Sequence, residues 1–143
     1  MNKAKKTALI ILISVVVLIM GFTAIFFATA FERVSRTIFE ANNADVSEII
    51  NEEYDEDSWI TPENFLKARV VSDSISMEDK YVNFKTKYSI PTIKNGEFSF
   101  KCNIKAFVHG WDDDSKETFE GKREIVLVFE KWQWNVKDVK EFT

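Results

Sequence analysis

Hydrophobic residues form one long, unbroken stretch near the start of the chain. No residue from Thr7 to Phe31 is charged, and most are apolar. At the α-helical rise this stretch would be roughly 37 Å long, which exceeds the roughly 30 Å of a bilayer's hydrocarbon core. It predicts a single transmembrane helix, with residues 1–31 as stub and anchor and residues 32–143 as one domain on one side of a membrane.

Helical spacing continues after this stretch. Apolar residues recur at Phe31, Val34, Ile38 and Ala41, so the helix is expected to continue out of the membrane until Asn42-Asn43-Ala44 breaks it.

Asp45 and Glu48 then have the spacing of a capping box, in which the Asp45 side chain accepts an N–H of the first helical turn. The short helix after Asp45 is expected to turn three residues inward: Val46, Ile49 and Ile50.

A second short helix is predicted farther along the chain. Thr61 can cap a helix and Pro62 suits its first position, so a helix is expected over about Pro62 to Ala68. It should bury Phe65 and Leu66.

Alternation of polar and apolar residues marks the second half of the chain. From Tyr81 to Ile90 the even positions are mostly apolar and the odd positions mostly polar, which predicts a strand that Pro91 ends. Asn95-Gly96 is typical of a two-residue hairpin turn. The strand from Glu97 to His109 repeats the alternation, with six residues inward: Phe98, Phe100, Cys102, Ile104, Ala106 and Val108.

Further strands complete the predicted sheet. After a turn over Gly110 to Ser115, the segment from Arg123 to Phe129 is apolar on both faces, as expected of a central strand. A tight turn near Lys131 leads to a last strand from Gln133 to about Phe142, with Trp134 and Val136 on one face. With a first strand over Val70 to Ser76, the order predicts an α+β domain: short helices packed on a curved antiparallel sheet of four or five strands.

Charge gives the predicted anchor a direction. Lys3, Lys5 and Lys6 precede the apolar stretch without any acidic residue, which favours a cytoplasmic N-terminus and an extracytoplasmic domain. The alternative is a signal peptide cleaved near Ala30, since Ala28-Thr29-Ala30 fits a cleavage site and would release a secreted domain. Signal peptides have about 7–15 apolar residues, so the length of this stretch favours the uncleaved anchor.

Composition limits the partners of the domain. All 23 acidic residues follow residue 31, with 16 of the 19 basic residues, so the domain carries a net charge near −7. An acidic domain without a run of Lys or Arg predicts no binding of nucleic acid. The bias toward Ile, Lys, Asn and Glu is that of an AT-rich genome and suggests a bacterium.

Candidate metal sites are not supported by the residue patterns. The acidic segment from Asn51 to Ser58 lacks the spaced ligands and central Gly of a calcium loop, so a solvated loop is expected. Asp112-Asp113-Asp114 is more typical of a turn than of a cation site. His109, the only histidine, has no ligand partner nearby. We therefore expect no catalytic, cofactor-binding or metal-binding residue.

Three tryptophans are candidates for a partner surface. Trp59 and Trp111 fall in predicted loops, and Trp132 is expected opposite the face of Phe129. Exposed aromatic residues often mark an interface. The alternative is that they cap the ends of the domain.

Two segments carry a family resemblance. The chain from Phe39 to Ile50 (FEANNADVSEII) and the ending from Trp134 to Val139 (WNVKDV) resemble the nuclear-transport-factor-2-like superfamily, over about residues 31–143. The resemblance implies a cone-shaped α+β fold. It also implies one of two uses: holding or transforming a small molecule in the cone, or assembly, as in membrane-anchored subunits of bacterial type IV secretion and conjugation machines.

Catalysis in such a cone needs a buried acid or base. The inward positions carry Thr86, Tyr88 and Cys102 but no carboxylate, so no enzymatic activity is expected. Tyr88 and Cys102 could line a pocket, but a buried free cysteine more often packs as a small hydrophobe.

The sequence therefore favours a membrane-tethered, non-enzymatic interaction module. It would contact lipid through Thr7 to Phe31, and other envelope proteins or copies of itself through the open face of the sheet. The alternative is a domain that binds or senses a small apolar ligand.

Overall fold

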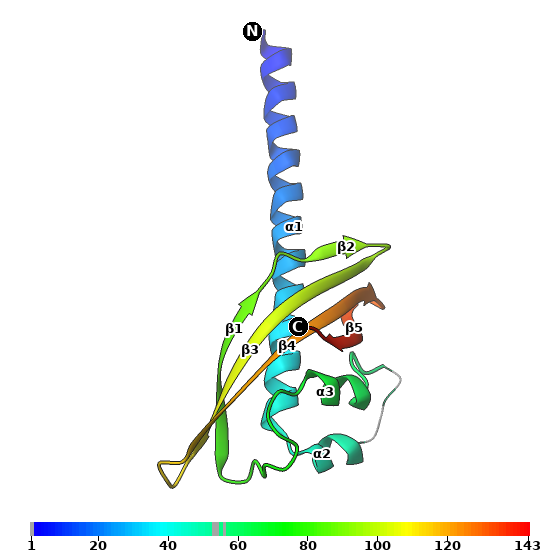
Figure 1. Ribbon diagram of the computed structural model, residues 1–143. Helices are drawn as coiled ribbons and strands as arrows, with labels where there is room; N and C mark the ends of the chain where they lie inside the picture. The colour runs from blue at the N-terminus through cyan, green and yellow to red at the C-terminus, as the bar shows by residue number, and fades with distance from the viewer. Residues whose placement is uncertain (1, 53–54, 56) are drawn as a thin grey trace. The chain divides into compact units, whose positions relative to one another are not determined.

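The computed structural model describes residues 2–52, 55 and 57–143, and its architecture is α+β (Figure 1). Three helices come first: α1 (Lys3–Asn43), α2 (Val46–Asn51) and α3 (Pro62–Ala68). An open antiparallel sheet follows, made of β1 (Lys80–Tyr88), β2 (Thr92–Lys94), β3 (Glu97–Gly110), β4 (Lys116–Glu130) and β5 (Gln133–Glu141). The chain divides into two compact units between Glu32 and Arg33.

The first unit is the apolar part of α1. This helix is long and apolar enough to cross a membrane, and its side chains from Leu9 to Phe22 are exposed. The hydroxyls of Ser14 and Thr23 each donate to the carbonyl four residues earlier, at 2.8 Å. Because these hydroxyls are satisfied within the helix, they do not interrupt its apolar surface.

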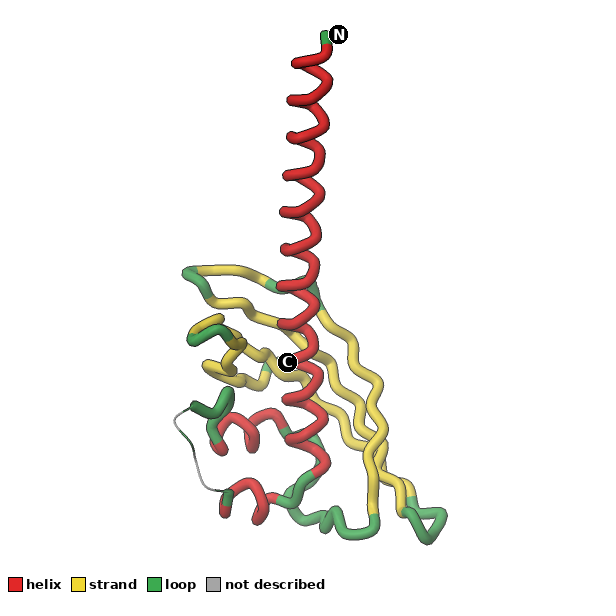
Figure 2. Tube along the Cα trace, turned by 180° about the vertical axis from the view of Figure 1, so that it is seen from behind, coloured by secondary structure: helices red, strands yellow, loops and turns green. Residues whose placement is uncertain are grey.

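The second unit is a two-layer domain. The last turns of α1, together with α2 and α3, lie against one face of the sheet (Figure 2). The strand order is β1-β3-β4-β5, with β2 also paired to β3. The predicted central position of Arg123 to Phe129 is confirmed, because β4 lies between β3 and β5.

Alternation along β3 separates the core from solvent, as predicted. Five consecutive even positions are buried: Phe100, Cys102, Ile104, Ala106 and Val108. From the helical layer, the last turns of α1 contribute five buried residues: Val34, Thr37, Ile38, Ala41 and Asn42. The predicted continuation of the helix through Ala41 is also confirmed, although α1 includes Asn42 and Asn43 of the predicted break and ends at Asn43.

The strand predicted at Val70 to Ser76 is wrong. The backbone N–H groups of Val70 and Val71 donate to the Asn42 side-chain oxygen, at 2.8 and 3.1 Å, instead of to a neighbouring strand. Val71 and Met77 then pack in a buried cluster with Val82, Ala106 and Val108. The apolar residues of this segment therefore close one end of the core as an irregular connection.

The capping box predicted at Asp45 is also wrong. Asp45 occupies the N-cap position of α2, but its side chain makes no cap hydrogen bond. It accepts a hydrogen bond from the backbone N–H of Met77 at 2.6 Å instead. The cap predicted at Thr61 is confirmed, because its hydroxyl accepts from the Asn64 N–H at 3.2 Å.

The two short helices present different residues to the core than periodicity suggested. In α2, Ile49 is buried but Ile50 is 60% exposed. In α3, the buried residues are Asn64 and Ala68, whereas Phe65 and Leu66 are only partly covered. The Asn64 amide donates to the Lys137 carbonyl of β5 at 3.4 Å, which explains why this polar position faces inward. In the acidic segment from Asn51 to Ser58, residues 53, 54 and 56 lie outside the described residues.

A further correction concerns the end of β1. The strand ends at Tyr88 rather than Ile90, and the Ile90 side chain is 90% exposed. The Ser89 N–H still donates to the Lys101 carbonyl at 2.9 Å. Pro91 has no N–H to continue this pairing, and the chain resumes on β3 as β2.

A buried polar network holds the end of α1 against the chain after α3. The Arg69 guanidinium is buried and donates to the carbonyls of Ala41, at 2.9 Å, and of Ala44. Burial lowers the pKa of Arg69, while the nearby carboxylates of Asp73 and Asp45 oppose this shift. The network satisfies main-chain groups at the C-terminus of α1, which has no helical partners for its last carbonyls.

Replacing Asn42 with Ala should destabilise the domain by about 2–4 kcal/mol, because it leaves the buried N–H groups of Val70 and Val71 without an acceptor. Asn43→Ala is the matched control. The side-chain amides of Asn42 and Asn43 each donate to the carbonyl four residues earlier, but the Asn43 bond lies at an exposed site. For Asn43→Ala, a change in stability within about 0.5 kcal/mol is therefore expected. Urea unfolding of the full chain in detergent measures both, and equal losses would contradict the role of Asn42.

The turn between β4 and β5 is strained. Lys131 and Trp132 both have positive φ, 54° and 61°. This left-handed conformation costs an L-residue roughly 1–2 kcal/mol. The turn between β2 and β3 has the same signs of φ, but there Asn95 and Gly96 tolerate them. A lysine and a tryptophan therefore occupy a turn that favours Asn-Gly.

Replacing Lys131 with Asn and Trp132 with Gly together should stabilise the β4–β5 hairpin by about 1 kcal/mol, because the strain is relieved. The converse double substitution, Asn95→Lys with Gly96→Trp, should destabilise the β2–β3 hairpin by a similar amount. Hydrogen exchange of the β5 and β3 amides measures the two effects. An unchanged β5 exchange rate in the first variant would show that the turn is not strained.

Candidate functional site

The face of the sheet away from the helices forms the candidate interaction surface, which we call the open face. Directly paired residues of antiparallel strands lie on the same face, and the register pairs Lys85 with Lys105 and Phe107 with Thr118. Through β1, β3 and β4, the open face carries the odd positions of β1 and β3 and the even positions of β4.

Lysines surround a single aromatic ring on the open face. The ammonium groups of Lys116, Lys105 and Lys85 lie 5.0, 5.8 and 6.0 Å from the centroid of the Phe107 ring. Lysine ammonium groups at this distance are attracted by the ring quadrupole. The result is an apolar centre with a positive rim, which we call the Phe107 patch.

Like charges oppose each other at this patch. Lys85 and Lys105 are a direct cross-strand pair, an arrangement that destabilises a sheet. Across the part of the chain that the structure describes, neither Lys85, Lys105 nor Lys116 lies within ion-pair distance of a carboxylate. On the other side of Lys105, β4 places Glu120 directly opposite it, so a carboxylate-bearing residue also borders the patch without forming an ion pair.

Charges on the β5 side are internally paired. Lys137 binds Glu97, which lowers the pKa of Glu97 and raises the pKa of Lys137 through a hydrogen bond and charge attraction. Lys140 lies 3.8 Å from Asp138. Among the described strands, ion-paired lysines occur only on β5, so the Phe107 patch is distinguished by its central ring and not by the lack of ion pairs.

An aromatic cluster extends the patch toward the β3–β4 turn. The Tyr81 ring stacks on His109 at 5.0 Å and contacts Trp111 at 4.4 Å. His109 thus lies on the outward face, as predicted. Trp111 is 68% exposed, so its ring is available at the end of the cluster.

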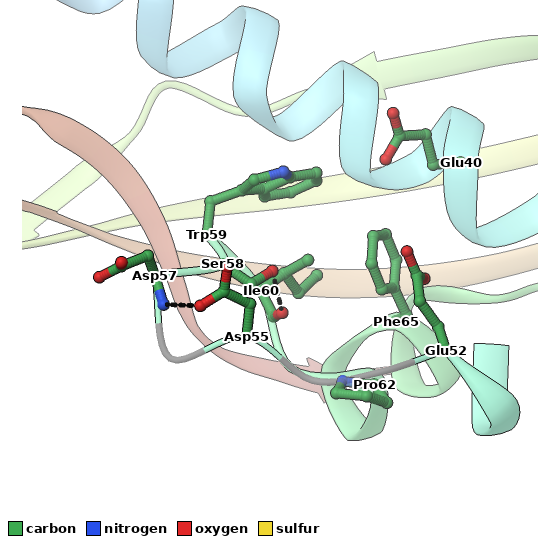
Figure 3. A pocket seen from close by; sticks show the side chains of 9 residues that line it. All are labelled: Glu40, Glu52, Asp55, Asp57, Ser58, Trp59, Ile60, Pro62 and Phe65. Atoms are coloured by element: carbon green, nitrogen blue, oxygen red, sulfur yellow. Dashed lines mark hydrogen bonds between the residues drawn. The ribbon is translucent and has the colours of Figure 1, made fainter.

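A pocket lies beside α1 and α3, and Figure 3 shows the side chains that line it. This pocket has a volume of about 330 Å³ and is lined by acidic residues and by the rings of Trp59 and Phe65, which meet edge to face at 5.5 Å. The guanidinium of Arg33 lies 4.4 Å from the Trp59 ring centroid. A cation of the protein therefore already occupies one face of this ring.

The acidic residues of the β3–β4 turn, which were considered as a cation site, include one that hydrogen-bonds within the turn. Asp113 accepts hydrogen bonds from the Ser115 hydroxyl and, at 2.9 Å, from the Ser115 N–H; these bonds close the β3–β4 turn and lower the pKa of Asp113. Among the described residues, no three His, Cys, Asp or Glu side chains come together where they could hold a metal ion. Among all the described residues, the buried polar or charged residues include no carboxylate: they are Thr37, Asn42, Asn64 and Arg69.

Tyr88 and Cys102 are paired across β1 and β3, on the inner face. Burial raises the pKa of the Tyr88 hydroxyl, and a hydrogen bond with Ser35 of α1 opposes this rise. Cys102 is fully buried. The Phe107 patch was missed by sequence reasoning, because only the register of β1 on β3 brings Lys85 beside Lys105.

Comparison with known proteins gives no relative: no family model, curated protein or solved structure matches the chain.

The Cys102 thiol should be unreactive in the folded protein. Burial raises its pKa to about 12, above the ordinary value near 8.5, and only the thiolate is a good nucleophile. This raised pKa stabilises the fold below about pH 8.5, and the contribution is lost as pH rises toward 12.

At pH 8 a maleimide should label Cys102 only as the domain unfolds in urea. A Lys101→Cys substitution in a Cys102→Ala background places a thiol at the adjacent, exposed position and should label at once. Rapid labelling of native Cys102 would contradict its burial.

Proposed function

We propose that this protein is a membrane-tethered interaction module. The apolar part of α1 is the anchor, and residues 32–143 form the domain that meets a partner. The lysines at positions 3, 5 and 6 support a cytoplasmic N-terminus and an extracytoplasmic domain, because cytoplasmic flanks are enriched in positive charge.

The observation that carries the proposal is the Phe107 patch. A partner that places carboxylates against Lys85, Lys105 and Lys116 would relieve their mutual repulsion and cover the Phe107 ring. Interfaces commonly combine an apolar centre with a polar rim, and complementary charge steers association and fixes the register of two surfaces. The partner surface is therefore acidic with an apolar centre.

The acidic balance of the whole domain supports a protein partner over nucleic acid. With a net charge near −7, the domain as a whole repels a phosphate backbone. A partner envelope protein, or an acidic surface on another copy, requires only the local positive charge of the patch.

A filled interior favours interaction over ligand binding in the cone. Phe100, Ile104 and Leu127, on the inner face of β3 and β4, are fully buried. Their side chains occupy the space that a small apolar ligand would need.

We further propose that the domain belongs to the nuclear-transport-factor-2-like superfamily. Helices that cover one face of a long antiparallel sheet support this assignment, as do the segments Phe39 to Ile50 and Trp134 to Val139. Within that superfamily, the layout of one anchor and one outer domain favours an assembly subunit of a cell-envelope or secretion complex.

Charge reversal tests the patch. The full chain is extracted from its own membranes in mild detergent, and its complexes are separated by blue-native electrophoresis and identified by mass spectrometry. Lys85→Glu with Lys105→Glu should abolish the co-purifying partner, because two attractive contacts become repulsive.

The control, Lys67→Glu with Lys131→Glu, makes the same change in net charge away from the open face and should retain the partner. Phe107→Ser should weaken the complex, whereas Ile50→Ser removes an exposed apolar residue of α2 and should not. A complex that survives both patch variants, or a wild-type protein that migrates alone, would refute the proposal.

A further inference from the structure

Large apolar side chains are exposed at one end of the sheet. Trp132, in the β4–β5 turn, is 94% exposed, and Ile90, between β1 and β2, is 90% exposed. Ile93 of β2 is also exposed. Figures 1 and 2 show that the β2–β3 and β4–β5 turns lie at the same end of the sheet, and that the β3–β4 turn lies at the other.

Side-chain and main-chain contacts link this end to Arg33, the first residue of the second unit. Asp57, in the connection between α2 and α3, contacts the residues on both sides of Trp132. Its side chain lies 3.7 Å from the Lys131 ammonium group, and its carbonyl accepts from the Gln133 side chain at 3.2 Å. In the same connection, the Arg33 guanidinium lies over the face of the Trp59 ring, and the Trp59 carbonyl accepts from the Val136 N–H.

The opposite end of the sheet is linked to the other end of the same helical segment. Asp45, just after α1, accepts from Met77, and the Asp79 carbonyl accepts from the Trp111 N–H at 2.9 Å. The segment of α1 from Arg33 to Asn43 therefore runs from the Trp132 end of the domain to the Trp111 end.

The chain enters the second unit at its Trp132 end, because Arg33 is the first residue of that unit. That stretch ends at Phe31, and only Glu32 separates it from Arg33 within the unbroken helix α1. If the stretch spans a bilayer, the Trp132 end is the end of the domain that the chain brings to the membrane surface.

We propose that this end of the domain rests on the lipid surface, with Trp132, Ile90 and Ile93 in the interfacial layer of the same membrane that holds the anchor. The inference rests on the membrane tether of the proposed function. Tryptophan is enriched at membrane interfaces, where its ring is apolar and its indole N–H remains hydrated. Apolar side chains beside it add buried area to such a contact.

The charges at this end are mixed. Lys94 and Lys131 are basic, whereas Asp57 and Glu130 are acidic, and Lys131 is already paired with Asp57. The contact is therefore apolar in origin and does not require anionic lipid. Lys94 can extend its ammonium group to the headgroups while its alkyl stem stays with the apolar residues.

Lipid quenching of tryptophan fluorescence tests the contact on the full chain. The protein is reconstituted into vesicles of zwitterionic phosphatidylcholine, either unmodified or brominated on the acyl chains near the glycerol. The apolar stretch contains no tryptophan, so fluorescence comes only from the outer domain. Brominated lipid should quench the wild type, and Trp132→Phe should remove most of that quenching. Trp111→Phe, the matched control at the opposite end, should retain it.

Three outcomes are informative. Quenching that disappears in Trp132→Phe and persists in Trp111→Phe supports the contact. Absent quenching, or quenching unaffected by Trp132→Phe, overturns the contact while leaving the tether and the Phe107 patch intact, provided that the protein stays in the vesicles after alkaline carbonate. Release of the protein by carbonate overturns the tether of the proposed function and the lipid contact with it.

Discussion

The domain depends on one set of buried hydrogen bonds, between the end of α1 and the chain that follows α3. Asn42 accepts from Val70 and Val71, and Arg69 donates to the carbonyls of Ala41 and Ala44. An unpaired buried main-chain group costs about 1–3 kcal/mol, so these side chains satisfy groups that neither the helix nor the sheet can reach. They fix where α1 ends and allow the irregular segment after Arg69 to close the core with Val71 and Met77.

The same sheet uses its two faces differently. The inner face is filled by apolar side chains and is fully committed to the fold, as Phe100 and Leu127 illustrate. The open face keeps three unpaired lysines around Phe107, at a cost that the β5 side avoids by pairing Lys137 with Glu97. This arrangement does not add to the stability of the sheet, because like charges paired across two strands are unfavourable.

Local signals in the sequence predicted the elements whose structure has a local cause. Alternation located β3 and the inward position of Cys102, Asn95-Gly96 located a hairpin, and Thr61-Pro62 located the start of α3. The failures involve partners far along the chain. Asp45 has the sequence of a cap but bonds to Met77, 32 residues away, and Val70 has the composition of a strand but bonds to Asn42. The Phe107 patch was not predicted for the same reason, since it depends on the registers of β1 and β4 on β3.

These long-range bonds also impose an order on events during synthesis. The donors for Asn42 are made 28 and 29 residues after it, so the end of α1 cannot reach its final state while the chain is still shorter than Val71. The apolar stretch is complete well before that point. Until the strands are made, the residues that α1 will bury, such as Val34 and Ile38, remain uncovered next to the stretch. The newly made chain therefore passes through a stage in which its apolar stretch is complete and the rest of the chain is still unfolded.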